Sequence, residues 1–167
     1  MLFHPETELH VNITIKSLYI YIFRTYERWK EATEIVGRSV NLTLMVFHQA
    51  ACWFKDKELV DDFKRWCIVW FYCHVKVMKN SSSLHLNASS VLHPEELAAL
   101  NNSPQPGPMA MLNLRELFAE ADLSPEQFRA MESSLTVLWN LNGQSVRIRR
   151  FAIPHGLSLM CTGLVQV

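Results

Sequence analysis

The first third of the chain carries an apolar stripe at helical spacing, and this stripe limits the possible folds more than any other feature. Between positions 11 and 54, apolar residues recur three or four positions apart: Ile15, Leu18, Tyr19, Ile22, Tyr26 and Trp29, then Val36, Val40, Leu44 and Phe47. A period near that of the α-helix predicts one long helix or two consecutive ones, with Gly37 as a weak point or bend. The whole chain of 167 residues has only 5 glycines, which favours an all-α fold over a sandwich or barrel.

Further helices are expected at residues 59–78, 94–102, 109–121 and 124–149. The first of these is unusually aromatic. Apolar side chains nearly surround its centre, as is typical of a helix buried among neighbours or against lipid. Residues 79–93 and 102–108 are predicted to be surface loops, the second because its three prolines remove backbone donors. Residues 1–167 have the length of a single domain with one core.

Two of the expected helices have specific start signals. Pro94 is followed by two glutamates, and Ser124-Pro125-Glu126-Gln127 joins a capping serine to a glutamine three residues later. Proline in the first turn, acids near the N-terminus and this serine–glutamine spacing all favour a helix that begins there. The second start predicts a long helix that ends before Pro154. One apolar face of it should pack on the region of Leu44 and Phe47, and that face contains Phe128, Met131, Leu135 and Leu138.

The charges and the cysteines exclude two classes of protein. The 16 basic and 16 acidic side chains cancel without a long run of either sign, whereas nucleic acid requires a basic face. The 4 cysteines have no paired spacing, so we expect reduced and mostly buried thiols rather than disulfides or a zinc site.

No catalytic or metal-binding set is recognisable in the sequence. The 7 histidines form no His-x-x-x-His pair, and neither a Gly-rich phosphate loop nor a Gly-x-Ser-x-Gly elbow occurs. Glu31 and Glu34 lie one turn apart, but a solvated helix face explains them better than a bound cation does. The acidic residues at positions 56–62 complement a helix N-terminus and lack the spacing and glycine of an EF-hand. We therefore expect no enzyme, no metal and no cofactor.

Two distant segments, residues 23–31 and 142–154, interleave aromatic residues with arginines. Each lies where a partly apolar helix gives way to a polar one. Such charges suit a membrane–water boundary or a protein interior that supplies partners. The ordinary alternative for the first segment is an amphipathic boundary with Trp29 in the core and Arg28 paired to Glu31.

The order and spacing of these segments resemble the bestrophin family of anion channels. Phe23 to Glu31 is similar to the family's FR-T-x-x-Y-x-RW-W-E-like run, and residues 36–41 are similar to its W-G-x-x-V-N-like continuation. Residues 142–154 are similar to its G-x-x-ER-I-x-x-x-P-like run. The resemblance covers residues 15–167. The chain departs from the family where Ser145-Val146 replaces the usual Cys-Glu, so a charged partner for the next arginine is missing there.

The resemblance implies a chloride or other small-anion channel of five identical subunits, partly embedded in a plasma or plastid membrane and in contact with its lipid. It implies a narrow apolar neck, for which the candidates are Ile15, Tyr19 and Phe23. It also implies a membrane-boundary motif made of Arg24, Tyr26, Arg28, Trp29 and Glu31, and a second motif made of Gly143, Arg147, Ile148 and Pro154. Core packing remains the alternative for the three neck candidates.

The chain is expected to be incomplete at both ends relative to that family. It has no uninterrupted run of about 20 apolar residues, and the family's first and last membrane helices would lie outside it. Two alternatives to a conducting subunit therefore remain, a soluble helical interaction module and a non-conducting truncated homologue.

Overall fold

A computed structural model describes the backbone of residues 5–79 and 90–150 and the side chains of residues 15–78 and 90–150. This part of the chain is all-α and contains no strand, which confirms the expected fold class. Its helices are α1 (Pro5–Trp53), α2 (Lys57–Lys79), α4 (Pro94–Asn102), α5 (Pro106–Glu120) and α6 (Pro125–Arg150).

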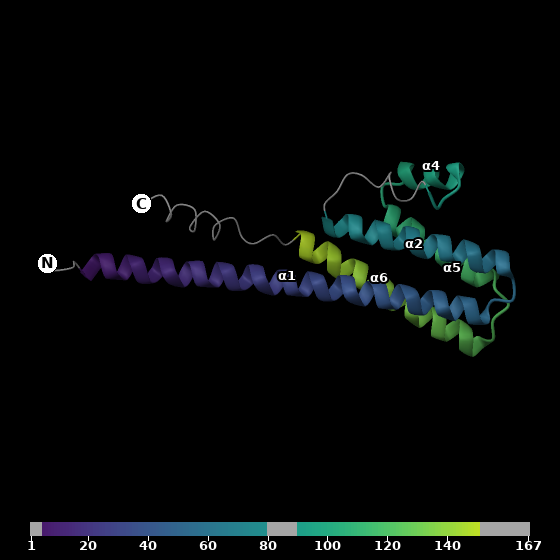
Figure 1. Ribbon diagram of the computed structural model, residues 1–167, viewed down its shortest axis with the longest axis horizontal. Coiled ribbons are helices and arrows are strands. Elements are labelled where there is room, and N and C mark those ends of the chain that lie inside the picture. The colour runs from purple at the N-terminus through teal and green to yellow at the C-terminus, as the bar shows by residue number, and fades with distance from the viewer. Residues whose placement is uncertain (1–4, 80–89, 151–167) are drawn as a thin grey trace.

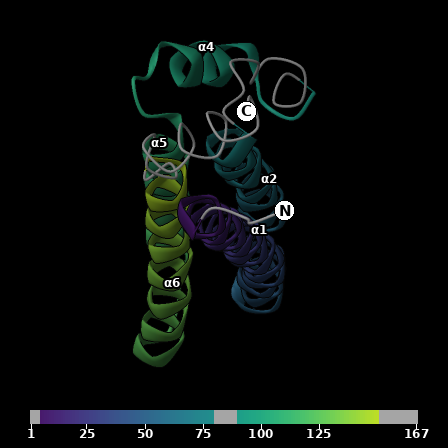
Figure 2. The ribbon, with the colours of Figure 1, turned by 90° about the vertical axis from the view of Figure 1, so that its left-hand side faces the viewer.

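α1 is one uninterrupted helix that runs the length of the molecule (Figure 1). Its 49 residues span roughly 73 Å at about 1.5 Å per residue, and Gly37 does not break it. α2 and α6 lie beside its C-terminal half, whereas its N-terminal half extends beyond them. Figure 2 shows α5 and α6 on one side, α1 and α2 on the other, and α4 across one end.

The core lies where α2 meets α5 and where α1 meets α6. Most of its largest fully buried side chains come from α2, α5 and α6, among them Phe63, Trp70, Met111, Phe118, Met131, Leu135 and Leu138, and α4 adds Leu100. α1 contributes the smaller residues Val46 and Ala50, which are completely buried. The predicted apolar face of α6 is therefore largely confirmed. Phe128, by contrast, is 43% exposed, although its ring contacts that of Phe118 at a centroid distance of 4.4 Å.

Proline in the first turn of a helix explains why α6 begins where predicted and why the loop before α5 is shorter than predicted. α6 starts as predicted, since the Gln127 N–H donates to Ser124 Oγ at 3.3 Å and the Ser124 N–H donates to Gln127 Oε1 at 2.9 Å. The predicted loop at 102–108 is too long, because Asn102 ends α4 and Pro106 already begins α5. The first N–H groups of a helix have no intrahelical acceptor, so prolines there remove no bond.

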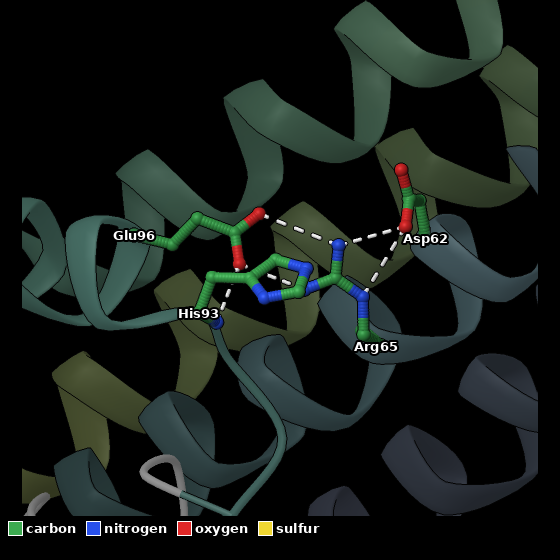
Figure 3. A network of polar contacts seen from close by, with 4 residues as sticks. All are labelled: Asp62, Arg65, His93 and Glu96. Atoms are coloured by element: carbon green, nitrogen blue, oxygen red, sulfur yellow. Dashed lines mark hydrogen bonds and ion pairs between the residues drawn. The ribbon is translucent and has the colours of Figure 1, made fainter.

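Arg65 connects α2 to α4 (Figure 3). Its guanidinium lies between two carboxylates and donates to Asp62 Oδ1 at 2.7 Å and to Glu96 Oε2 at 2.7 Å. The same carboxylate of Glu96 accepts the backbone N–H of His93 at 2.9 Å. One glutamate thus caps α4 and holds it against α2.

This contact predicts an acid-sensitive attachment of α4. Burial alone would raise the pKa of Glu96, but the hydrogen bonds from Arg65 and the His93 N–H hold that pKa below its ordinary value. The stabilisation is therefore complete above about pH 4.5 and is lost as the pH falls through the lowered value. We expect Glu96→Gln to weaken the protection of α4 amides from hydrogen exchange at pH 7 and to flatten its dependence on acid. The neighbouring exposed Glu95→Gln is the control, and equal behaviour of the two variants would contradict this prediction.

Candidate functional site at the junction of α1 and α6

The two motifs meet at the point where α6 ends beside α1. Arg28 on α1 donates from its guanidinium to the backbone carbonyl of Ile148, 120 residues away. Arg147 on α6 forms an ion pair with Glu31 on α1, with 2.8 Å between Nη2 and Oε1. The alternative that pairs Arg28 with Glu31 is therefore wrong, because each of the two residues contacts α6 instead.

The bond from Arg28 has a simple physical cause. The C-terminal part of a helix carries the negative end of its dipole, which favours a cation beside it. Ile148 lies in the last turn of α6 that the structure describes, so its carbonyl lies in this part of the helix. A half-buried guanidinium donates to this carbonyl from the neighbouring helix. Glu31 in turn supplies Arg147 with an acid that the second motif itself lacks.

A prediction follows for the exposed ion pair between Glu31 and Arg147. Their side chains are 45% and 61% exposed, so the pair should add only about 0.2–1 kcal/mol to stability. We expect a coupling energy in this range from a double-mutant cycle of Glu31→Gln and Arg147→Gln, measured by urea unfolding. A coupling of zero would show that the two side chains do not hold α1 and α6 together.

The remaining boundary residues are exposed rather than packed. Tyr26 and Trp29 are 58% and 63% exposed, and their rings contact each other at a centroid distance of 5.9 Å. The alternative that places Trp29 in the core is therefore wrong for this chain. Arg24 is exposed on α1 and Gly143 is exposed on α6. Pro154 lies outside the described residues.

The neck candidates lie on the part of α1 that extends beyond the bundle. Ile15, Tyr19 and Phe23 are 60%, 68% and 48% exposed. The rings of Tyr19 and Phe23 lie nearly parallel with centroids 6.3 Å apart. Core packing, the alternative considered for these residues, is absent for all three in the described chain.

Most of the apolar stripe of α1 is a face that the rest of the described chain leaves uncovered, although Val36 and Phe47 are partly buried. The core face of α1 instead carries Ile35, Ser39, Val46 and Ala50. Val46 and Phe47 belong to the core that holds Met131, Leu135 and Leu138 of α6, as the sequence predicted for this region. In contrast, Val40 and Leu44 are 37% and 51% exposed. These two residues form one wall of an open apolar groove of about 400 Å³, and α2 supplies the other wall with Cys67, Ile68, Phe71 and Tyr72.

A buried polar cluster lies beneath the junction. His74 of α2 lies within hydrogen-bonding distance of Ser39 on α1 and Ser145 on α6, and all three are at most 1% exposed. The spacing of residues along the chain does not reveal this cluster, because its members come from three different helices. The available signal was a histidine within the aromatic, nearly all-apolar helix.

The described residues contain no group of three or more His, Cys, Asp or Glu side chains that could hold a metal ion. Burial raises the pKa of Cys67 and Cys73 to about 12, so these thiols stay protonated and are poor nucleophiles. No helix in the described part of the chain combines the length and apolarity needed to cross a membrane.

Comparison with known proteins does not assign the chain to a group, since no family model and no curated protein matches its sequence. Function must therefore be inferred from the junction, the uncovered face of α1 and the buried cluster.

Proposed function

We propose that the chain is a subunit of an oligomeric anion channel, in which the N-terminal half of α1 faces an axis shared by five copies. The observation that supports the proposal most strongly is the junction of α1 and α6, where Arg28 contacts Ile148 and Glu31 pairs with Arg147. Two motifs 120 residues apart meet through Arg28, Glu31 and Arg147 at the level where α1 leaves the bundle. This is the arrangement expected if both motifs mark the same boundary of a channel subunit.

The exposed apolar side chains beyond the junction support an oligomer. Large apolar patches on soluble monomers are uncommon and mark surfaces that contact other proteins or membranes. Here Ile15, Tyr19, Ile22 and Trp29 are each more than half exposed on one helix. Packing copies of α1 around an axis would cover part of this surface. Each apolar residue that faces the axis would then form one ring of side chains around the ion path.

The same residues suit the passage of anions. Aromatic rings have a positive edge, and rings of Tyr19 and Phe23 around a narrow path can present that edge to a partly dehydrated anion. An apolar constriction can also gate by excluding water. Arg24 and Arg28 follow these rings along α1 and form no ion pair with an acid in the described chain, so they would raise the local concentration of anions.

Chloride efflux tests this proposal. The full chain is purified in detergent, its oligomeric mass is measured by native mass spectrometry, and it is then reconstituted into chloride-loaded liposomes. We expect a five-fold mass and chloride efflux above that of protein-free liposomes. A stable monomer in plain buffer that produces no efflux would overturn the proposal.

A second candidate is a helical interaction module without transport. The apolar groove between α1 and α2 favours it, since a groove between two antiparallel helices can receive a third helix. This candidate predicts a soluble chain whose Leu44→Glu variant is unchanged in fold but loses self-association or partner binding. The channel proposal predicts that chloride efflux accompanies assembly, which an interaction module would lack.

A further inference from the structure

His74 joins three helices through one ring nitrogen. Its Nε2 lies 2.9 Å from Ser39 Oγ on α1 and 3.4 Å from Ser145 Oγ on α6. The imidazole stacks on Trp70, one turn earlier on α2, with ring centroids 5.2 Å apart and planes inclined by 14°. The ring is 1% exposed, so these contacts form without water from the bulk solvent.

The two serines determine where the imidazole carries its proton. Each hydroxyl hydrogen is already donated within its own helix, from Ser39 to the Ile35 carbonyl at 2.7 Å and from Ser145 to the Leu141 carbonyl at 3.0 Å. A hydroxyl has a single hydrogen, so both oxygens face the ring as acceptors. Nε2 must therefore carry the hydrogen and donate it, chiefly to Ser39.

The opposite ring nitrogen is then an acceptor without a donor. His74 Nδ1 and Asn142 Oδ1 are both buried and both lack a hydrogen-bond partner. Asn142 nevertheless acts on the pKa of His74 as a hydrogen-bonding neighbour. Two acceptors cannot bond each other. They are satisfied if a proton on Nδ1 bonds to Oδ1, or if the amide turns over and donates from Nδ2 to a neutral ring.

The surroundings allow the amide to turn and supply no compensating charge. α5 faces Asn142 with Gly107, where even an added Cβ would lie 3.9 Å from Asn142 Nδ2. The titratable neighbours on α2 are Cys73, which is buried and protonated at neutral pH, and Lys76, which acts on Cys73. On α1 the charged residue next to Ser39 is Arg38, which is exposed and positive, and on α6 Arg147 pairs with Glu31 of α1.

We propose that His74, Ser39, Ser145 and Asn142 form an acid-sensitive latch, in which a proton on His74 Nδ1 reorients the Asn142 amide and releases α1 from α2 and α6 below the junction. The neutral ring holds the three helices together. The protonated ring places a charge without a counter-ion in the core, and opening the contact returns that charge to water. The latch does not depend on conduction of anions, so it can be tested separately from the proposed function.

The direction of the effect follows from the position of the ring. Burial lowers the pKa of His74, and the neighbouring Asn142 side chain offsets this only in part, so that pKa remains below its ordinary value of 6.5. The open state consequently binds the proton more tightly than the closed state. Between the pKa of His74 in the closed state and its pKa in the open state, each decrease of one pH unit shifts the equilibrium toward the open state by up to tenfold. Above about pH 6.5 the latch stays closed.

Hydrogen exchange of the full chain, corrected for the intrinsic pH dependence of exchange, tests the latch. We compare the wild type with His74→Gln, whose amide can still donate to Ser39 but does not titrate, and with Asn142→Asp, which gives the imidazolium a counter-ion. In the wild type, opening of α1 around Ser39 should rise by up to tenfold per pH unit below pH 6.5, while the α2–α5 contact stays protected. His74→Gln should remove this rise, and Asn142→Asp should remove it or shift its midpoint.

Titration of the His74 ring protons by NMR in the wild type keeps the test decisive even if one variant fails to fold. The latch requires a midpoint below 6.5 that coincides with the change in exchange. Identical exchange profiles for the wild type and His74→Gln would overturn the proposal. A ring that titrates at its ordinary value without any change in exchange at α1 would also overturn it.

Discussion

Replacing Phe63 with alanine is expected to lower the free energy of unfolding by about 3–5 kcal/mol, whereas the same change at Phe23 should cost less than about 0.5 kcal/mol. Phe63 is completely buried and meets Phe54 edge-on, with ring centroids 5.3 Å apart. Its removal leaves a cavity that the packed helices cannot fill. Phe23 is 48% exposed on the projecting half of α1, so its truncation leaves no cavity in the described bundle.

The two variants form a matched pair, because the same atoms are deleted from two helices. Urea unfolding followed by circular dichroism measures both differences. Small domains are stable by only about 5–15 kcal/mol, so Phe63→Ala should bring the chain close to unfolding. Comparable losses for the two variants would mean that Phe23 is packed in the folded protein, contrary to the structure described here.

Replacing Ile15, Tyr19 and Phe23 together with alanine is expected to change conduction without unfolding the chain. In the proposed channel each substitution occurs once in every subunit, so the apolar constriction widens at three levels at once. A wider and less apolar constriction wets more readily and gates less tightly. We expect chloride efflux from proteoliposomes to rise several-fold, while the helical content and the urea midpoint stay near those of the wild type.

The control for this triple variant removes apolar surface elsewhere on the exposed part of the chain. Leu112 of α5 is 56% exposed, and Val137 of α6 is 37% exposed. Alanine at both positions should leave chloride efflux unchanged. If the triple variant instead unfolds, the three side chains are core residues of the assembled protein and do not line a path.

The helix starts could be predicted because their signals are local. Ser124 and Gln127 are three residues apart, and their reciprocal hydrogen bonds need no other part of the chain. The start at Pro94 is equally local, because the His93 N–H donates to Glu96 three residues later. The start of α5 at Pro106 differs from the prediction, because proline breaks the interior of a helix but removes no bond in the first turn.

The stripe on α1 was read correctly as helical, but the sequence does not tell which face the core covers. The uncovered stripe contains large residues such as Tyr19 and Leu44. The core face contains Ser39, Val46 and Ala50, which contrast little with an ordinary helix surface. Small residues let α6 and α2 approach α1 closely, so burial here follows from fit as well as from hydrophobicity.

The junction and the latch could not be derived from spacing, because their partners come from distant segments. Arg28 meets Ile148, and His74 meets Ser39 and Ser145, only after the helices have packed. The resemblance to a channel family selected both motifs as important. It did not identify the contacts between them, and the local alternative of Arg28 with Glu31 was equally consistent with the sequence.

Accessibility of position 19 during chloride efflux tests the central claim most directly. Tyr19→Cys and Glu34→Cys are prepared in a background with Cys52→Ser and Cys161→Ser, which removes the exposed thiol among the described residues and the thiol of Cys161 outside them. A negatively charged thiol reagent is then added to proteoliposomes while chloride efflux is recorded. If α1 lines the anion path, modification at position 19 should block efflux at once, and modification at position 34, on the polar side of α1, should not. Efflux that is unaffected by complete modification of position 19 would contradict the account.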